Sequence, residues 1–494
     1  MTRPWTDREV REALGLNPDR AVEGVSFTGV STDSRSTKPG HLFVALVGER
    51  FDGHRFVMEA LARGATGAVV SGPAPGEEVA RLYPVSDTLA ALGALARYRR
   101  DALGARVVGI TGSSGKTTTK DLLKEALGES FRIHATPGNL NNRVGLPLTI
   151  LSAPADTEVL VLEMGSNEPG EIRILTEIAR PDMGIITTVS ETHLEKLGSL
   201  EGVLEEKLDL IRGLPEGAPV LVGDDPPQLP GRARLLAGRV QVAGWTGLSD
   251  QALRPREPET NGKGCFHFRW MDEPVHLGIP GRHSVQNALL ALACAEALGV
   301  PREDAAKRVA RVEAGNMRSE VRTLGGLTLL VDCYNANPQS VRAALELLSS
   351  FPDLGPRVAV LGSMLELGER SAALHKELLL DAMGRELDLV VATGHFAQAA
   401  QGMESRREGP ELIIASGVAR AERVLLEHLG GSEVVLLKAS RGVAMERMIP
   451  ALEKRFAALS KPGDRPSSGT EKSTPGGPHG FGNDPARHLT GKEV

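Results

Sequence analysis

The sequence predicts an α/β protein built on parallel sheets, with functional loops at the carboxyl ends of the strands. Short apolar runs repeatedly break into small polar residues and then continue as helical patterns, as at residues 107–120, 327–338 and 357–368. This alternation of strand and helix is typical of doubly wound sheets. At 494 residues, the chain is long enough for about three domains, each with its own core.

The strongest motif is the segment VVGITGSSGKTTTK at residues 107–120. Gly112 and Gly115 allow a tight turn whose backbone N–H groups point inward, and the following helix N-terminus adds partial positive charge. Lys116 would contact the outer phosphates of a nucleoside triphosphate, and Thr117 would ligate Mg²⁺. The standard spacing G-x-x-x-x-G-K-[ST] is not met, because an isoleucine stands where its first glycine would be. A glycine-rich turn without a nucleotide is the alternative, which the adjoining Lys-Thr pair disfavours.

Composition argues against several classes of function. Hydrophobic residues make up 41% of the chain, as in globular proteins, whereas aromatic residues at 3% are too sparse for base-stacking surfaces. A net charge of -6 and a pI near 6.1 disfavour nucleic acid or an anionic membrane as the main partner. Cys265, Cys294 and Cys333 are scattered and odd in number, so they indicate neither a disulfide framework nor a zinc site. The N-terminus lacks an apolar signal region and no long apolar run occurs, so we expect a soluble, cytoplasmic protein.

The N-terminal region predicts a small α/β unit. Thr6 and Glu9 have the spacing of a capping box at the start of a helix. A strand at 67–70 and an Ala/Leu-rich helix from Thr88 follow. Between them and the first helix, the segment VSTDSR at residues 30–35 clusters hydroxyls, an aspartate and an arginine. It either binds a polar ligand or forms a turn with a surface ion pair, and residue chemistry alone favours the turn.

Two features of the central region border the expected ligand crevice. The loop at residues 136–148 carries three asparagines, whose amides suit a phosphate or sugar ligand, although such loops are usually plain turns. The strand at 158–163 is apolar until Glu163. A carboxylate at the carboxyl end of a parallel strand is well placed to reach a metal, and a solvated strand end is the alternative.

Three further residues of this region have ambiguous patterns. His193 follows the apolar strand at 183–189, and its place beside a strand end makes a functional role as plausible as a structural one. Lys207 lies in a helix at 200–211, where periodicity predicts a solvated charge between Val203 and Ile211. Asn287 lies near the start of a helix and would read a base edge or face solvent.

The third region repeats the strand-loop-helix plan. Apolar strands are expected at 327–332, 357–362, 387–393 and 433–437, which predicts a second parallel sheet. From about residue 460 the chain becomes rich in Pro, Gly, Ser and Lys, so we expect a disordered tail at 460–494.

Seven motifs in a fixed order carry a resemblance to a known family. They are TGSSGKTTTK, TPGNLNNxxGLPLT, LEMGSNEPGEI, THLE, GRHSVQNA, DCYNANP and LGSMLELGE. Together they resemble the Mur ligase family over about residues 25–450. The resemblance implies an N-terminal UDP-substrate domain at 1–104, a central P-loop ATP-binding domain at 105–312 and a C-terminal Rossmann-like ligase domain at 313–459.

The same resemblance implies an activity. The motifs look like those of the branch that joins D-alanyl-D-alanine to UDP-N-acetylmuramoyl-tripeptide, using ATP and an acyl phosphate, in peptidoglycan synthesis. A branch adding the third residue of the stem peptide is the nearest alternative, disfavoured because MLELGE is present and a DNPR-type motif is absent. A non-catalytic nucleotide-binding regulator is a third reading, disfavoured by the retained constellation of Lys116, Glu163, His193 and Lys207. We expect a monomer with no nucleic-acid or membrane partner.

The resemblance also implies roles for individual residues. The catalytic group is Lys116, His193 and Lys207, with Lys207 carbamylated by carbon dioxide. Two Mg²⁺ ions would be held by Thr117, Glu163, His193 and Lys207. ATP would be bound by Gly112, Ser113, Ser114, Gly115, Lys116, Thr117, Thr118, Asn287, Arg318, Asp332, Tyr334, Asn335 and Asn337. The UDP substrate would be bound by Ser31, Asp33, Ser34, Arg35, Asn139, Asn141 and Asn142.

Two positions depart from the family's pattern. Ser363 stands where an acidic residue is usual before MLELG, and Lys438-Ala-Ser440 replaces the usual K-G-S. The first departure puts any role of that side chain in doubt.

Overall fold

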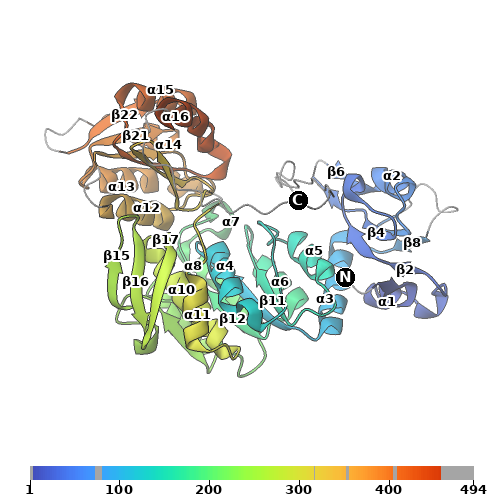
Figure 1. The fold of residues 1–494 in the computed structure, drawn as a ribbon. Coiled ribbons are helices and arrows are strands. Elements are labelled where there is room, and N and C mark those ends of the chain that lie inside the picture. The colour runs from blue at the N-terminus through green and yellow to red at the C-terminus, as the bar shows by residue number, and fades with distance from the viewer. Residues whose placement is uncertain are drawn as a thin grey trace, which may run out of the picture.

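The computed structural model describes residues 4–49, 51–72, 81–315, 317–351, 355–403 and 409–457. Figure 1 shows three regions in chain order, with the N-terminal region at one end of the central region and the C-terminal region at the other. The three-domain α/β prediction is therefore confirmed. The predicted tail at 460–494 lies outside the described residues.

The N-terminal region contains a parallel four-stranded sheet. Its strands, in spatial order, are β3 (Gly29–Ser31), β4 (His41–Val44), β7 (Gly67–Val70) and β8 (Arg81–Pro84). Helix α1 begins with the predicted capping box, in which Thr6 and Glu9 each accept from the other's backbone N–H. The remaining elements are β1 (Trp5–Thr6), α1 (Asp7–Ala13), β2 (Ser26–Phe27), β5 (Val47–Gly48), β6 (Phe51–Asp52) and α2 (Val57–Ala62).

Helix α3 (Thr88–Leu103) joins this region to the central one. Arg99 donates from Nη2 to the Ala153 carbonyl at 3.2 Å, and Arg100 donates from Nε to the Ala179 carbonyl at 3.0 Å. Both carbonyls lie at the ends of central helices, where a cation satisfies unpaired acceptors and the helix dipole. The two arginines therefore fasten α3 to the central domain.

The central region is organised around a parallel six-stranded sheet. Its spatial order is β10 (Ile133–Ala135), β11 (Val159–Glu163), β9 (Arg106–Thr111), β12 (Met183–Ile186), β13 (Val220–Gly223) and β14 (Val240–Ala243). Alternate residues of β11 enter different cores: Val159 and Val161 pack with α10, whereas Leu160 and Leu162 pack on the opposite face. Burial on both faces explains the continuous apolar strand sequences.

Helices cover both faces of this sheet, and a small antiparallel sheet lies beside it. The helices are α4 (Lys116–Leu127), α5 (Gly145–Ser152), α6 (Glu171–Ala179), α7 (Leu194–Leu197), α8 (Leu200–Arg212), α9 (Gln228–Leu236), α10 (Arg282–Ala297) and α11 (Arg302–Val309). The antiparallel strands are β15 (Arg256–Thr260), β16 (Cys265–Trp270) and β17 (Glu273–Pro280).

The C-terminal region has a second six-stranded sheet. Its spatial order is β18 (Glu320–Leu324), β19 (Leu327–Asp332), β23 (Val434–Lys438), β20 (Arg357–Leu361), β21 (Leu389–Thr393) and β22 (Glu411–Ala415). All neighbouring strands are parallel except β18, which pairs antiparallel with β19. The predicted parallel sheet is confirmed, and the antiparallel edge strand is an addition to it. Its helices are α12 (Pro338–Ser350), α13 (Ser371–Met383), α14 (His395–Ala399), α15 (Val418–His428) and α16 (Ile449–Phe456).

Candidate active site

The loop between β9 and α4 forms the predicted glycine turn. Gly112 has φ 144° and Gly115 has φ 85°, both in the range that favours glycine. The neighbouring atoms also exclude any side chain at these positions. A Cβ on Gly112 would lie 2.0 Å from Thr187 Oγ1, and one on Gly115 would lie 2.4 Å from Asn287 Oδ1. The turn places the N-terminus of α4 at the carboxyl edge of the sheet, which is the arrangement that binds phosphate in P-loop proteins.

Lys116 is the first residue of α4 and folds back over the loop. Its Nζ donates to the Gly112 carbonyl at 2.7 Å. Desolvation lowers the pKa of its amine, Glu163 opposes that shift, and the charge of Arg318 from the C-terminal domain adds to it. Two cations facing one glycine loop create a strong attraction for an anion.

Glu163 ends strand β11 and is 2% exposed, so the alternative of a solvated strand end is wrong. Its Oε2 accepts from Thr117 Oγ1 at 2.9 Å, and its Oε1 accepts from Asn141 Nδ2 at 2.7 Å. A hydroxyl and a carboxylate held together beside a phosphate loop are the hard oxygen donors that Mg²⁺ prefers. The residues present therefore fit a Mg²⁺ ion.

Lys207 lies on α8 and is also 2% exposed, which overturns the prediction of a solvated charge. Helix α8 packs against α6, α7, α9 and two central strands, so it has no broad solvent face. The Lys207 Nζ donates to Ser166 Oγ at 2.6 Å. Burial, followed by the charge of Lys116, lowers the pKa of Lys207 to about 7.

Glu206 precedes Lys207 and is buried as well, but its charge is used elsewhere. Its carboxylate accepts from the backbone N–H groups of Gly170 at 2.6 Å and Ile172 at 2.8 Å, at the start of α6. These bonds hold the carboxylate at a helix N-terminus, and its charge partly opposes the lowering of the pKa of Lys207.

His193 lies at the start of α7 with φ 52°. Its Nδ1 is 2.5 Å from Oε2 of Glu366, which belongs to the C-terminal region. The structure therefore brings His193 against the loop that follows β20 of the C-terminal region.

The C-terminal domain also reaches the glycine loop itself. Asn337 donates from Nδ2 to Ser114 Oγ at 2.9 Å, while its Oδ1 caps α12. Asn287 is 3% exposed beside Gly115. These contacts place two of the expected nucleotide residues directly on the loop.

The expected nucleotide residues of the C-terminal region gather near the ends of its strands, whereas Ser113 and Thr118 belong to the central domain. Lys438 Nζ is 2.7 Å from Asp332 and donates to the Asn335 carbonyl at 2.8 Å. The Arg318 guanidinium lies 3.9 Å from the centroid of the Tyr334 ring. Ser113 hydrogen-bonds the Ser190 carbonyl, and Thr118 lies on the first turn of α4.

The expected UDP-substrate residues fall into two groups. Asp33 caps the short turn at 34–36 and pairs with Arg35 at 2.7 Å, which lowers the pKa of its carboxyl. Ser31 donates to the Asp33 carbonyl at 2.9 Å, and Ser34 is buried in the turn. The favoured turn with an ion pair is thus present, and none of its described contacts reaches the glycine loop. Its ligand role stays a prediction.

The three asparagines of the loop at residues 136–148 make different contacts. Asn141 binds Glu163 and therefore belongs to the metal-side cluster, whereas Asn142 accepts from the N–H of Gly145 at 2.8 Å and shapes the start of α5. Asn139 accepts from the N–H of Asn141 at 2.7 Å through its carbonyl. Of the three, Asn141 is the one that the structure ties to the P-loop centre.

Sequence reasoning did not single out Ser166, Glu206 or Glu366. Ser166 and Glu366 lie inside quoted motifs, LEMGS and MLELG, which was the available signal. Glu206 had no signal, because a helical period assumes one solvent face and α8 has neighbours on several sides.

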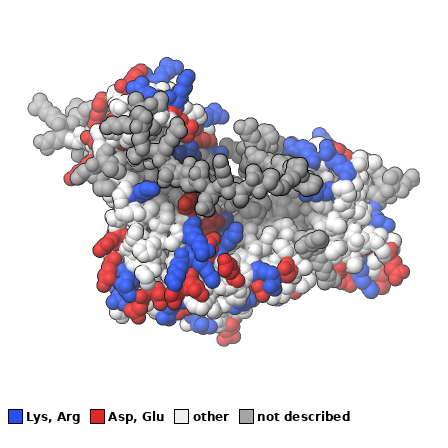
Figure 2. Space-filling model, viewed as in Figure 1, with Lys and Arg blue, Asp and Glu red and all other residues white. Residues whose placement is uncertain are grey.

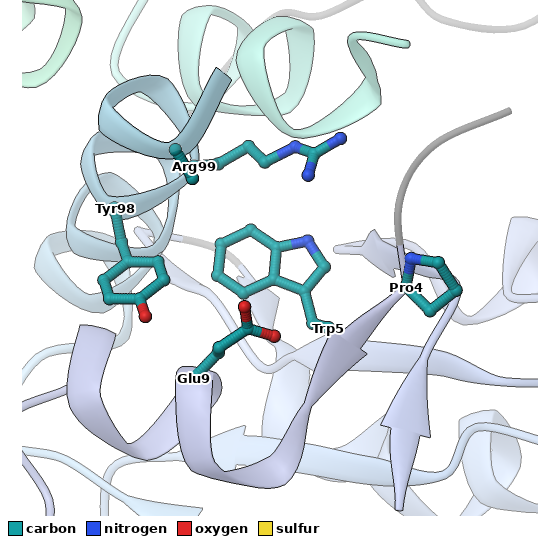
Figure 3. Close-up of a pocket in the computed structure, with 6 residues that line it drawn as sticks. Pro4, Trp5, Glu9, Tyr98 and Arg99 are labelled. Carbon is teal, nitrogen blue, oxygen red and sulfur yellow. The ribbon is translucent and has the colours of Figure 1, made fainter. Parts of the chain in front are cut away.

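Outside this cluster, the residues that the structure describes offer few rival sites. Within the described ranges, no three His, Cys, Asp or Glu side chains are grouped to hold a metal, and the three cysteines are buried free thiols. No helix in those ranges is long and apolar enough to cross a membrane. On the face in Figure 2, basic and acidic side chains are interspersed. Figure 3 shows a small hollow in which Trp5 lies among Glu9, Tyr98 and Arg99, at the α1–α3 junction.

The fold and the glycine loop define an α/β protein with a phosphate-binding turn of the P-loop type. Family models match consecutive parts of the chain: "Mur ligase family, catalytic domain" at 26–100, "Mur ligase middle domain" at 110–295, and "Mur ligase, glutamate ligase domain" at 317–441. The chain belongs to the Mur ligase family.

Individual relatives are similar over most of their length. The chain is 37% identical to the UDP-N-acetylmuramoyl-tripeptide–D-alanyl-D-alanine ligase of Bacillus subtilis (strain 168), covering 86% of this chain and 93% of that one. A crystal structure of MurF from Acinetobacter baumannii aligns with a TM-score of 0.83 at 32% identity, covering 92% and 100%. MurF ligase from Thermotoga maritima in complex with ADP aligns with a TM-score of 0.77 at 32% identity, covering 87% and 98%.

The glycine loop generates a direct prediction. Replacing Gly115 with Ala should weaken ADP binding by roughly tenfold or more, because the positive φ and the contact with Asn287 both oppose a Cβ. Isothermal titration of the purified protein measures the change. Gly104→Ala is the matched control, since Gly104 has φ 63° and no atom within 4 Å of its Cβ position. Equal ADP affinity in both variants would contradict the assignment.

Proposed function

We propose that this chain is an ATP-dependent, ADP-forming ligase that joins D-alanyl-D-alanine to UDP-N-acetylmuramoyl-tripeptide. The observation that carries the proposal is the cluster at the carboxyl edge of the central sheet, where Lys116, the Thr117–Glu163 pair and Lys207 meet. The names and the high coverage of the relatives support the substrates, and the ADP complex supports the nucleotide.

The proposed ligation has two steps, phosphoryl transfer and amide formation. A carboxylate oxygen of the tripeptide attacks the γ-phosphorus of ATP, which gives an acyl phosphate and releases ADP. The amine of D-alanyl-D-alanine then attacks the acyl carbon and expels inorganic phosphate, losing a proton as the amide forms. Lys116 and the N-terminus of α4 stabilise the charge on the transferring phosphoryl group.

Thr117 and Glu163 would hold one Mg²⁺ ion, with His193 and Lys207 toward a second. Such ions supply positive charge that offsets the negative charge on the phosphate oxygens. Lys207 as a free cation would repel them, which gives carbamylation a chemical purpose. After the ammonium loses a proton, the neutral amine would add carbon dioxide at Nζ and release a second proton, which leaves a carbamate anion in place of the cation. Carbamate formation requires a neutral amine, and a pKa near 7 makes that form abundant at neutral pH.

The remaining assignments follow the three regions. We assign the turn containing Ser31, Asp33, Ser34 and Arg35 to the uridine end, and Asn139, Asn141 and Asn142 to the pyrophosphate and muramoyl end. Asn287 would contact adenine, Arg318 and Asp332 the ribose and phosphates, and the loop at 334–337 the nucleotide side of the C-terminal domain. The domain limits at 1–104, 105–312 and 313–459, a cytoplasmic location and a monomeric state belong to the same proposal.

The choice of amine tests this function. With ATP and UDP-N-acetylmuramoyl-tripeptide, D-alanyl-D-alanine should stimulate ADP release at least about tenfold over free diaminopimelate or lysine, on the scale by which hydrogen-bonding sites discriminate between substrates. A coupled ADP assay measures this. ADP release with diaminopimelate or lysine on a dipeptide acceptor would instead support the ligase that adds the third residue. Nucleotide binding without ADP release would support a regulator.

Replacement of Lys207 tests whether its amine is carbamylated. Lys207→Ala should lower kcat by about a hundredfold or more, on the scale of losing one stabilising group, and small carboxylates should restore much of the loss without bicarbonate. Wild-type protein given ¹³C-labelled carbon dioxide should show a carbamate NMR signal that Lys207→Ala lacks. In metal-free protein, that signal should decline as pH falls below about 7, because the amine then becomes protonated.

Lys376→Ala provides the control, because Lys376 is an exposed lysine on α13. Full activity in Lys207→Ala, or a carbamate signal that persists in it, would contradict the modification.

A further inference from the structure

Two sequence motifs from different domains meet at helix α7. The THLE motif of the central domain, residues 192–195, lies against the MLELGE motif of the C-terminal domain, residues 364–369. The Glu195 N–H donates to the Glu366 carbonyl at 3.4 Å, and Arg370 pairs with Glu191 at 3.0 Å. Figure 1 shows α7 where the C-terminal domain meets the central one.

The two residues that face each other there share an unusual backbone. His193 has φ 52° and Glu366 has φ 64°, and left-handed conformations are uncommon outside glycine. Gly368 supports the approach, because a Cβ there would lie 3.3 Å from the Cα of Glu195. Both segments of the chain therefore have a left-handed backbone at the point where the imidazole meets the carboxylate.

The two ring nitrogens of His193 have different surroundings. Nδ1 is buried and lies 2.5 Å from Glu366 Oε2, close but without the alignment of a hydrogen bond. The side chain as a whole keeps 24% of its surface exposed, so the accessible edge of the ring is the one away from Glu366. Hydrogen bonds of active sites are often poorly aligned in the free enzyme and tighten with substrate.

We propose that Glu366 is a positioning residue for His193. Its carboxylate holds the proton of the imidazole on Nδ1 and leaves the Nε2 lone pair on the accessible edge of the ring. A carboxylate that orients a histidine in this way sets both the tautomer and the direction of the ring. Because Glu366 belongs to the C-terminal domain, its carboxylate reaches His193 only where that domain lies against the central one.

This inference rests on the proposed function, in which His193 lies toward the second Mg²⁺. It adds a role for MLELGE, which is followed directly by Arg370, the residue of a second charged contact between the domains. Arg370 and Glu191 pair across the same interface without touching His193. The two contacts thus provide a way to separate positioning from docking.

The test uses the full-length protein and two readouts. The first is the ¹⁵N chemical shifts of the His193 ring in the metal-free protein, assigned by comparison with His193→Gln. The second is the affinity for Mn²⁺ in the presence of ADP, measured by electron paramagnetic resonance. Glu366→Ala should move the tautomer population away from Nδ1–H and weaken Mn²⁺ binding by about tenfold. Glu366→Gln keeps an acceptor oxygen, so it should restore part of both.

Two further variants complete the comparison. Glu369→Ala removes an exposed charge from the same motif, and Arg370→Gln removes the ion pair to Glu191; both should leave the His193 shifts as in the wild type. Unchanged His193 shifts in Glu366→Ala would overturn the proposal, as would the same change in Arg370→Gln. The shifts are read without substrates, so a failure of the ligase assay is a separate result.

Discussion

The structure depends on a backbone turn that leaves no room for side chains. Gly112 and Gly115 lie so close to Thr187 and Asn287 that a single methyl group on either glycine would collide. That closeness aims the N-terminus of α4 and Lys116 at one point on the sheet edge. Every other feature of the site, from the buried Glu163 to the docked C-terminal loop, is arranged around that point.

The second feature is the burial of charge around the turn. Glu163 and Lys207 are each 2% exposed. Glu163 accepts a hydrogen bond from the Thr117 hydroxyl, and Lys207 donates one to the Ser166 hydroxyl. Buried charges are costly unless they are paired or bind ions. Metal ions bound between Glu163 and a carbamate on Lys207 would pair these buried charges. The same ions that stabilise the buried charges would then also serve the phosphoryl transfer.

Local patterns predicted the strand, turn and helix of the P-loop, the capping box at Thr6 and the second parallel sheet, because each depends on residues close in sequence. They failed for Lys207, whose burial comes from helices and strands on several sides of α8. They also missed the contact between His193 and Glu366, which are far apart in the chain and meet only after two domains dock. The family motifs pointed to Lys207 and His193, and the strand end before His193 also indicated a role for it, whereas Glu366 was only part of a quoted motif.

In the proposed reaction, the tripeptide carboxylate receives the terminal phosphoryl group of ATP. A tripeptide labelled with ¹⁸O in the reacting carboxylate tests it most directly, by mass spectrometry of the inorganic phosphate released during ligation. When the amine attacks the acyl phosphate, one carboxylate oxygen leaves with the phosphate. Each released phosphate should therefore contain one ¹⁸O atom. Unlabelled phosphate, formed alongside the amide product, would contradict it.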